Sequence, residues 1–259
     1  MGSGALHTDL AVVPQNLCFA LPSRVSFQEG AYCHLGGTAL QAVRRGRPEL
    51  GEYVVVVGMG LVGQLSAQLV GLSGASVMAW DTKPGRLRIA RQCGVEATVN
   101  PARKDVVAAA DAFTAGRGFD LAILAFGGPG SEALAQVKSV MAHTPDGHAE
   151  GRIVIVGGVE ASCQWAAGMG NLTVLSSART GPGYHDRAWE HGRVAYPHPW
   201  VRWSTGENLD LVLRLIAQKR LRVKPLTTKV LPLSRIDDAV GLHLDSPDTT
   251  IGTVLTMRS

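Results

Sequence analysis

The chain is dominated, from about residue 53 onward, by short apolar runs that alternate with segments of helical periodicity. Continuous apolar, β-branched runs predict strands buried on both faces of a sheet. They lie at residues 53–57, 76–80, 97–99, 120–125, 152–156 and 172–176. Helix-period segments lie at 61–72, 86–93, 105–114 and 131–141, and Ser131 is the expected N-cap of the last. Strands separated by helices predict an α/β fold with a doubly wound parallel (Rossmann) sheet.

Both ends of the chain have a less regular pattern. Residues 10–13 resemble a short strand, and residues 26–45 and 209–220 have the periodicity of helices. Two further runs, at 224–233 and 253–257, predict strands. We expect the two ends to pack together as a small element that flanks the sheet.

Composition narrows the class of protein. The chain has 259 residues, of which 46% are hydrophobic and 18% charged, so a folded globular protein is expected. Glycine is in excess at 31 of 259 residues, about 12% against a usual value near 7%. The net charge of +4 is spread along the chain without a long basic run, which argues against a nucleic-acid partner.

Nothing in the sequence indicates export or a membrane. Residues 53–80 carry no charge, but glycines interrupt them and their pattern fits strand, turn, helix and strand better than a membrane span. The start, Met1-Gly2-Ser3-Gly4, lacks the layout of a signal peptide. The four cysteines form no CxxC pair, which favours reduced thiols. We therefore expect a cytoplasmic protein.

A glycine motif follows the first predicted strand. Gly58, Gly60 and Gly63 form the pattern G-x-G-x-x-G at the start of a predicted helix. In a dinucleotide-binding turn, the first glycine permits the tight turn, the second admits the pyrophosphate, and the third lets helix and strand pack closely. The helix start at Leu61 and Val62 would direct backbone N–H groups at the phosphates.

The second predicted strand ends in an acid, Asp81, at the distance that the dinucleotide motif requires. Its carboxylate would accept hydrogen bonds from the adenosine ribose and repel a 2′-phosphate, which favours NAD. NADP stays possible because three cations, Lys83, Arg86 and Arg88, lie nearby. The alternative is that the glycines serve packing only and that no nucleotide binds.

Further glycines follow later strands. Phe126 and Gly127 come after the predicted fourth strand, and Gly157 and Gly158 after the fifth. Ligands of open parallel sheets bind at the carboxyl ends of the strands, so these residues are expected to line the cofactor crevice. Arg86 and Thr38 complete the set of expected cofactor contacts.

Together these residues resemble the nucleotide-binding part of the medium-chain dehydrogenase/reductase superfamily, the zinc-type alcohol dehydrogenase relatives. The resemblance runs over most of the chain, through Val12-Val13-Pro14, 25–31, 38–43, the glycine motif and 251–255. Gly181-Pro182-Gly183-Tyr184, Tyr196-Pro197 and 201–204 resemble the dehydrogenase part of bacterial two-part oxidoreductases.

The resemblance implies a domain organisation. Residues 46–220 would form the dinucleotide-binding Rossmann domain, and residues 1–45 and 221–259 a remnant of the GroES-like catalytic domain, most of which we expect to be missing. In the family, the strand near 171–175 pairs with its two-fold mate, so the resemblance also implies a homodimer.

The family's third zinc ligand matches His34, with Cys33 beside it. A catalytic zinc site needs three protein ligands and a water, so we predict no zinc and no other metal.

The chemistry then rests on other side chains. His34, Tyr184 and His185 are the candidate proton-transfer residues. The structural alternatives are a core histidine for His34 and a solvated surface loop for Tyr184 and His185. Arg179 and Arg202 are candidate substrate clamps, although Arg202, between Trp200 and Trp203, also suits cation–π packing.

We expect a zinc-independent, NAD(H)-dependent oxidoreductase that transfers a hydride to or from a small alcohol, carbonyl or enone. The alternative is a non-catalytic or redox-neutral dinucleotide-binding module that acts with a partner protein.

Overall fold

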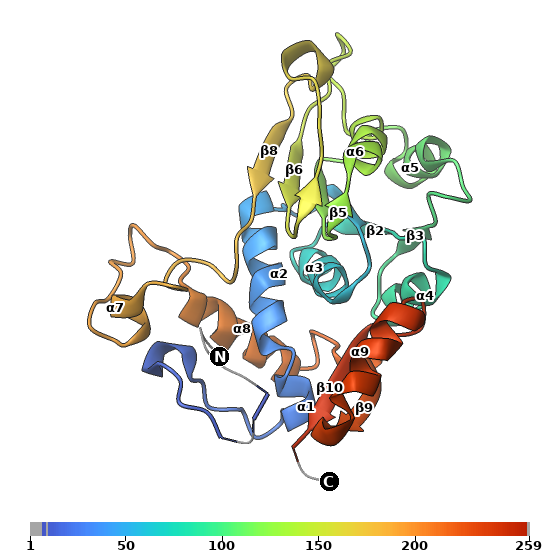
Figure 1. Ribbon diagram of the computed structural model, residues 1–259. Helices are drawn as coiled ribbons and strands as arrows, with labels where there is room; N and C mark the ends of the chain where they lie inside the picture. Colours follow the sequence, from blue (N-terminus) through green and yellow to red (C-terminus); the bar gives the residue numbers. More distant parts are fainter. Residues whose placement is uncertain (1–6, 9, 258–259) are drawn as a thin grey trace. The chain divides into compact units, whose positions relative to one another are not determined.

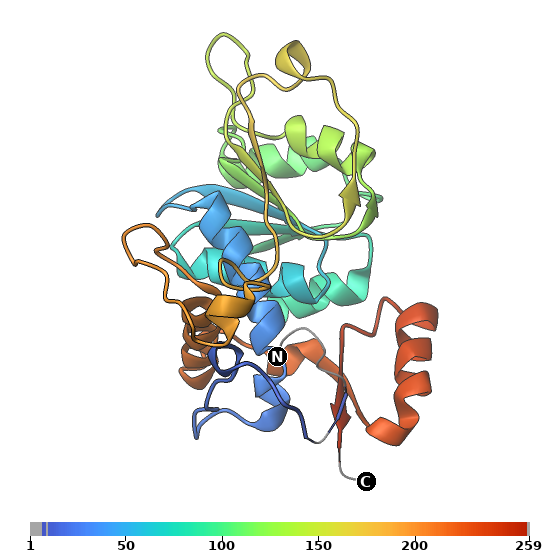
Figure 2. The ribbon, with the colours of Figure 1, turned by 60° about the vertical axis from the view of Figure 1, so that its left-hand side comes forward.

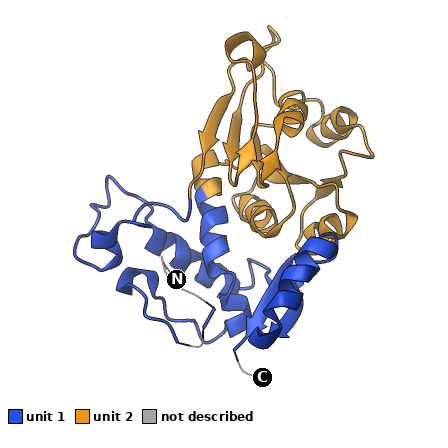
Figure 3. Ribbon diagram, viewed as in Figure 1, with its two compact units in different colours: residues 1–41, 179–259 blue, residues 42–178 orange. Residues whose placement is uncertain are grey.

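The computed structural model describes residues 7–8 and 10–257, which pack into two compact units (Figure 3). Unit 1 comprises residues 1–41 and 179–259, and unit 2 comprises residues 42–178. The domain boundary expected at residue 220 would place residues 179–220 with the sheet. In the structure these residues instead pack with the two ends of the chain.

Unit 2 is built on a six-stranded parallel sheet in the order β3-β2-β1-β4-β6-β8 (Figure 1). The strands are β1 (Tyr53–Val57), β2 (Ser76–Trp80), β3 (Ala97–Val99), β4 (Leu121–Leu124), β6 (Arg152–Ile155) and β8 (Thr173–Ser176). Each lies where the hydrophobic pattern predicts a strand. Numbered among themselves, they follow the order 3-2-1-4-5-6 of a doubly wound dinucleotide-binding fold, so the predicted fold class is confirmed.

Helices cover both faces of this sheet. They are α3 (Leu61–Leu72), α4 (Pro84–Gln92), α5 (Val106–Thr114) and α6 (Ser131–Lys138), together with the end of α2 (Cys33–Gly46). Val55 and Val57 face a core shared with α5 and α6. Successive strand residues point to opposite faces, so Val54 and Val56 face the other layer, where α3 packs (Figure 2). Strands buried on both sides explain the near-continuous apolar runs.

Two details of unit 2 differ from the prediction. Gly130, not Ser131, is the N-cap of α6, and the Ser131 hydroxyl instead accepts a hydrogen bond from the backbone N–H of Ser162 at 3.0 Å. The helix also ends at Lys138 rather than residue 141. The pattern does not predict the short pair β5 (Gly128–Pro129) and β7 (Val159–Glu160), nor the 3-10 turn Ala166–Gly168.

Unit 1 is mostly helical. Its helices are α1 (Phe27–Gly30), the first part of α2, α7 (Arg187–Glu190), α8 (Thr205–Ala217) and α9 (Ile236–Asp245), with 3-10 turns at Gln15–Leu17, Lys224–Leu226 and Leu233–Arg235. Strands β9 (Thr227–Pro232) and β10 (Gly252–Thr256) pair in parallel.

Several sequence-based predictions for unit 1 are wrong in detail. Residues 10–13 form no strand, Leu10 and Val12 are exposed, and no strand in the described part of the chain pairs with them. The single helix predicted over 26–45 is two helices, because Gly30 packs against Leu21 at a break before α2. Residues 224–226 form a 3-10 turn, since Pro225 has no N–H to donate to a strand.

Close packing of α2 against α8 explains why residues 179–220 belong to unit 1. Gly36 and Gly37 of α2 allow this approach, because a Cβ at Gly36 would lie 2.5 Å from Val212 and one at Gly37 would lie 2.8 Å from Leu209. Asn208, fully buried on α8, donates to the carbonyl of Thr180 at 2.8 Å.

A buried carboxylate fixes the start of α1. Glu29 accepts hydrogen bonds from the N–H and hydroxyl of Ser26, which complete a capping box, and its Oε1 lies 2.8 Å from Lys219 Nζ. The hydrogen bond from Lys219, together with that from Ser26, lowers the pKa of Glu29 from 4.5 to about 2.

We expect Glu29→Gln to lower the free energy of unfolding by about 1.5–3 kcal/mol at neutral pH, since a glutamine keeps the cap but loses the charge facing Lys219. The pKa is depressed in the folded state, so this stabilisation is complete above pH 4.5 and is lost as the pH falls toward 2. Urea denaturation of both proteins between pH 7 and pH 3 measures it. The exposed Glu96→Gln variant is the control, and a difference that does not shrink with acid would contradict this account.

Among the described residues, no helix combines the length and the apolar character needed to cross a bilayer. The uncharged stretch 53–80 is instead β1, α3 and β2.

Candidate functional site

A cavity of about 710 Å³ lies in unit 2 at the carboxyl ends of β1, β2 and β4. This is the edge of an open parallel sheet at which ligands bind. Its lining comes from the glycine motif, the turn after β2, the loop after β3, the loop after β4 and one face of α6. The residues are Val57, Gly58, Gly60, Trp80, Asp81, Thr82, Lys83, Arg86, Pro101, Ala102, Ala125, Phe126, Gly127, Pro129, Glu132, Ala133 and Gln136.

The three motif glycines have three different surroundings. Gly58 has φ +90°, a conformation that favours glycine, and its Cβ would lie 2.8 Å from the carbonyl oxygen of Ala125. A Cβ on Gly63 would lie 1.7 Å from the carbonyl oxygen of Gly58. Around Gly60, by contrast, no described atom lies within 4 Å of the Cβ position. Along the chain, a turn at Gly58, an open approach at Gly60 and a close helix contact at Gly63 therefore follow in the order that a dinucleotide-binding turn needs.

Asp81 is buried at the end of β2, with 8% of its surface exposed. Its Oδ2 accepts from the N–H of Met59, and its Oδ1 from the N–H of Lys83, both at 2.7 Å. Arg86 Nη1 lies 3.8 Å from Oδ2. Each carboxylate oxygen keeps a second acceptor position, so Asp81 is oriented by backbone and still able to accept from a diol such as a ribose.

The other expected cofactor residues are distributed as follows. Arg86, Phe126 and Gly127 line the cavity, and Leu61, Val62 and Gly63 form the first turn of α3, directly after Gly60. Gly157 and Gly158 do not line it, but the carbonyl of Gly158 accepts from Gly128 N–H at 2.8 Å, beside Gly127. Thr38 lies in unit 1, where its hydroxyl donates to the carbonyl of His34 at 3.4 Å.

Sequence reasoning missed part of this cavity. Pro101 and Ala102, after β3, and Glu132, Ala133 and Gln136, on one face of α6, carry no motif. The position of these residues in the sequence could have indicated them. Residues 132, 133 and 136 share one face of a helix, and this helix follows a strand whose carboxyl end lies at the edge of the sheet where ligands bind. Of the three cations near Asp81, Lys83 and Arg86 line the cavity, whereas Arg88 is exposed and does not.

The candidate proton-transfer residues form a cluster in unit 1. The rings of His34 and Tyr184 are 5.4 Å apart, and those of Tyr184 and His185 are 4.2 Å apart. The guanidinium of Arg179 lies 5.8 Å from the Tyr184 ring centre. Burial lowers the pKa of His34, and the nearby charge of Arg179 lowers it further. His34 is therefore held as the neutral imidazole, which can accept a proton.

Backbone geometry holds the loop of this cluster. His185 adopts φ +69°, which is unusual for a residue with a side chain, and its N–H donates to the buried carboxylate of Glu190 at 2.8 Å. The next residue, Asp186, caps α7 and accepts from the hydroxyl of Tyr196 at 2.6 Å. That hydrogen bond lowers the pKa of Asp186, while burial and the Asp186 carboxylate raise the pKa of Tyr196 to about 12.

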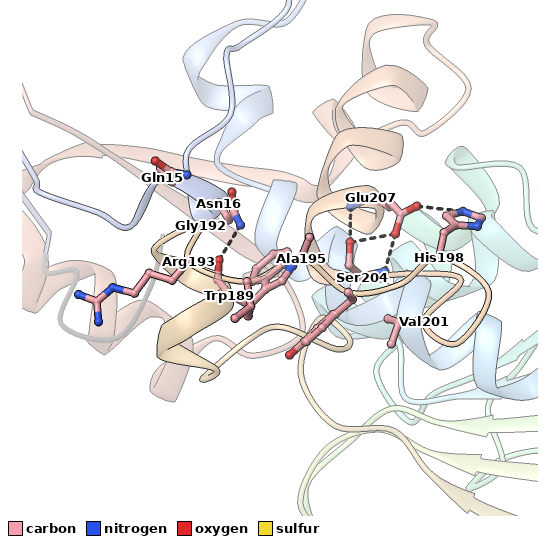
Figure 4. A pocket seen from close by; sticks show the side chains of 12 residues that line it. Gln15, Asn16, Trp189, Gly192, Arg193, Ala195, His198, Val201, Ser204 and Glu207 are labelled. Atoms are coloured by element: carbon pink, nitrogen blue, oxygen red, sulfur yellow. Dashed lines mark hydrogen bonds and ion pairs between the residues drawn. The ribbon is translucent and has the colours of Figure 1, made fainter.

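A second cavity, of about 610 Å³, lies within unit 1 (Figure 4), and Tyr196 is one of the residues that line it. Trp189 and Tyr196 stack at 6.0 Å in its wall, and Asn16 donates to the carbonyl of Trp189. Glu207 closes one end, where it caps α8 through Ser204 and lies 3.6 Å from His198. Most of the polar groups that line this cavity thus already take part in hydrogen bonds or ion pairs within the protein. Arg202 lies over Trp203 at 5.0 Å, the cation–π contact that was its structural alternative.

The described residues do not fit a zinc site. No group of three or more His, Cys, Asp and Glu side chains among them could hold a metal ion. Cys33 is buried, and burial raises the pKa of its thiol to about 12. None of the four cysteines, all of which lie in the described part of the chain, forms a disulfide.

Comparison with known proteins agrees with this architecture. Residues 62–190 match the family model described as zinc-binding dehydrogenase. D-xylulose reductase A of Aspergillus niger is 37% identical over 93 residues, which are 36% of this chain and 26% of that protein. The 2-dehydro-3-deoxy-L-galactonate 5-dehydrogenase of Pseudoalteromonas atlantica is 25% identical over 236 residues, 91% of this chain and 60% of that protein.

Among solved structures, 2R,3R-butanediol dehydrogenase of Bacillus subtilis superposes with a TM-score of 0.69 at 24% identity, covering 92% of this chain and 60% of that one. The chain thus spans less than two thirds of the length of the curated relatives it matches. The family match and the relatives show that the chain is similar to zinc-type alcohol dehydrogenases, and the strand order and the solved structure show that it shares their dinucleotide-binding fold.

Proposed function

We propose that the chain binds NAD(H) in the cavity of unit 2 and serves an oxidoreductase that acts on a small alcohol, carbonyl or enone without zinc. The observation that carries the proposal is the pairing of an open approach at Gly60 with a buried, oriented carboxylate at Asp81. These features suit the pyrophosphate and the adenosine ribose of a dinucleotide. The named activities of the relatives, a xylulose reductase, a galactonate-derivative dehydrogenase and a butanediol dehydrogenase, favour a polyhydroxylated substrate.

The residues of unit 2 have distinct roles in this proposal. The first turn of α3 places its N–H groups and the positive end of the helix dipole toward the phosphates, and no described side chain caps that helix. Phe126, Pro129 and Ala133 supply apolar surface for the adenine. Asp81 selects NAD through its charge, whereas Lys83 and Arg86 preserve some tolerance of a 2′-phosphate.

When bound, the nicotinamide supplies the hydride acceptor or donor of the reaction. The protein has to remove one proton from the substrate oxygen during oxidation, or deliver one during reduction. We assign this to Tyr184, whose ring centre lies 5.4 Å from that of His34 and 4.2 Å from that of His185. In this proposal the neutral His34 is the candidate acceptor of the proton, and Arg179, beside the Tyr184 ring, is the candidate clamp for a polar substrate.

Tyr184→Phe tests this assignment. We expect kcat for alcohol oxidation to fall by about 100-fold or more, because the phenol oxygen is lost while both ring contacts remain. Dinucleotide affinity, measured by NADH fluorescence, should stay within about twofold. Tyr53→Phe, on β1, is the control, since its hydroxyl accepts a hydrogen bond from Arg117 at 2.7 Å and does not line the cavity. Equal rates for Tyr184→Phe and the wild type would remove Tyr184 from the mechanism.

The function itself is tested by titrating the protein with NADH and NADPH and then measuring turnover. Sugar alcohols, sugar acids, 2,3-butanediol and an enone form the substrate panel. We expect NADH binding and turnover of a polyhydroxylated substrate. NADH binding without any turnover, together with a partner that co-purifies, would favour the non-catalytic or redox-neutral module. Absence of NADH binding would refute both the oxidoreductase and the dinucleotide-binding module.

We also propose a homodimer. Strand β8 lies at the edge of the six-stranded sheet, and an edge strand offers backbone groups for pairing with a two-fold mate. A solution mass equal to one chain would refute it.

A further inference from the structure

A fully buried glutamine, Gln64, connects the glycine motif to the turn that follows β2. It lies in the first turns of α3 with 0% of its surface exposed. Its Nε2 donates to two backbone carbonyls, that of Met59 at 3.3 Å and that of Arg86 at 2.8 Å. Both neighbours are acceptors, so the NH₂ group has to face them, and this fixes the orientation of the amide.

The amide oxygen of Gln64 has no donor within reach. Oε1 is buried and has no hydrogen-bond partner among the described residues. A buried acceptor without a partner destabilises the fold, and a methionine or leucine would fill the same space without that loss. Stability of the core therefore does not explain a glutamine here, whereas a requirement for two N–H donors does.

Those donors act on the peptide groups that form the cofactor turn. The N–H of Met59 is held by Asp81, and its C=O is held by Gln64. The C=O of Met59 shares a trans peptide group with the N–H of Gly60, and the two point in opposite directions. Holding the carbonyl toward Gln64 therefore directs the Gly60 N–H away from α3, and Gly60 lines the cavity.

The second donor acts on the specificity side of the same cavity. Gln64 holds the backbone of Arg86, whose side chain lies 3.8 Å from Asp81. Asp81 in turn holds Lys83 N–H. Two side chains, Gln64 and Asp81, thus connect the glycine turn with both cations that face the cavity.

We propose that Gln64 is a positioning residue for the dinucleotide: it orients the Met59–Gly60 peptide toward the phosphates and places Arg86 beside Asp81. This inference rests on the proposed binding of NAD(H). It predicts that removing the amide weakens cofactor binding without a comparable loss of stability.

The test compares Gln64→Met and Gln64→Leu with Gln68→Met, each in the full chain. Methionine preserves the length of glutamine but removes both donors. Gln68 is a matched control, because it is also a buried amide on α3, 7% exposed, and donates to the Gln64 carbonyl at 3.3 Å rather than to the cofactor turn. NADH and NADPH affinities are measured by fluorescence titration and stability by thermal melting.

We expect NADH affinity to fall about tenfold in both Gln64 variants, with a change in the NADH to NADPH ratio, while Gln68→Met stays within twofold of the wild type. Wild-type NADH affinity in both Gln64 variants would overturn the inference, and so would an equal loss in Gln68→Met. A wild-type protein that binds no NADH would instead refute the proposed function, and the inference with it.

Discussion

Gly63→Ala is expected to abolish dinucleotide binding and to destabilise unit 2. The new methyl carbon would stand 1.7 Å from the carbonyl oxygen of Gly58 and 2.9 Å from its carbonyl carbon. Both are backbone atoms, so no side-chain rotation relieves the clash, and α3 has to move away from the turn. We expect the free energy of unfolding to fall by about 3 kcal/mol or more. A displacement of this size at the phosphate turn should weaken NADH binding by about 100-fold or more.

Two other glycines provide matched controls for Gly63→Ala. Gly71 lies on the same helix, with no described atom within 4 Å of its Cβ position, so Gly71→Ala should raise stability by about 0.5–1 kcal/mol and leave NADH affinity unchanged. Gly60→Ala should fold with a loss below about 1 kcal/mol, because its φ of −71° suits alanine. Its methyl group projects into open space beside the cavity and should weaken NADH binding. Normal NADH binding by Gly63→Ala would contradict the packing account.

Asp81→Ser is expected to reverse the cofactor preference. It removes the negative charge that repels a 2′-phosphate and leaves Lys83 and Arg86 in the lining of the cavity. Loss of a repulsion of several kcal/mol predicts a shift in the NADPH to NADH affinity ratio of about 100-fold. The N–H groups of Met59 and Lys83 also lose their acceptor, so stability should fall by about 1–3 kcal/mol. Parallel titrations with the two cofactors measure the ratio.

The control for Asp81→Ser is Asp120→Ser. Asp120 also accepts from a backbone N–H, that of Tyr53 at 2.9 Å, but it does not line the cavity. Its variant should lose stability and keep the wild-type cofactor ratio. The charge account is wrong if both variants shift the ratio equally, or if neither does.

The centre of the sheet in unit 2 was predictable because β1, β2 and β4 are buried on both faces. The run Tyr53–Val57 has no polar residue to alternate with, and the glycines at 58, 60 and 63 mark the turn that follows. The local sequence pattern and the tertiary packing therefore both require apolar residues at these positions. The candidate site followed for the same reason: Gly58 and Asp81 belong to a motif with fixed spacing, and both line the cavity.

Unit 1 was less predictable because contacts between distant residues decide its structure. The sequence of residues 10–13 does not itself show whether another strand is available to pair with them. The helix α9 has only a short periodic signal, at Ile236, Ala239 and Val240, which did not predict a helix. The lining of the cavity by α6 depends on how that helix packs, not on any motif, and Gln64 is recognisable only from the two carbonyls it reaches.

The division of the chain has a consequence for its synthesis. Unit 2 is one continuous segment, 42–178, whereas unit 1 joins residues 1–41 to residues 179–259. Domains of a nascent chain fold as their residues leave the ribosome. The sheet of unit 2 can therefore form before α8, which packs on Gly36 and Gly37, has left the ribosome. During that interval the face of α2 at Gly36 and Gly37 is not yet covered by α8.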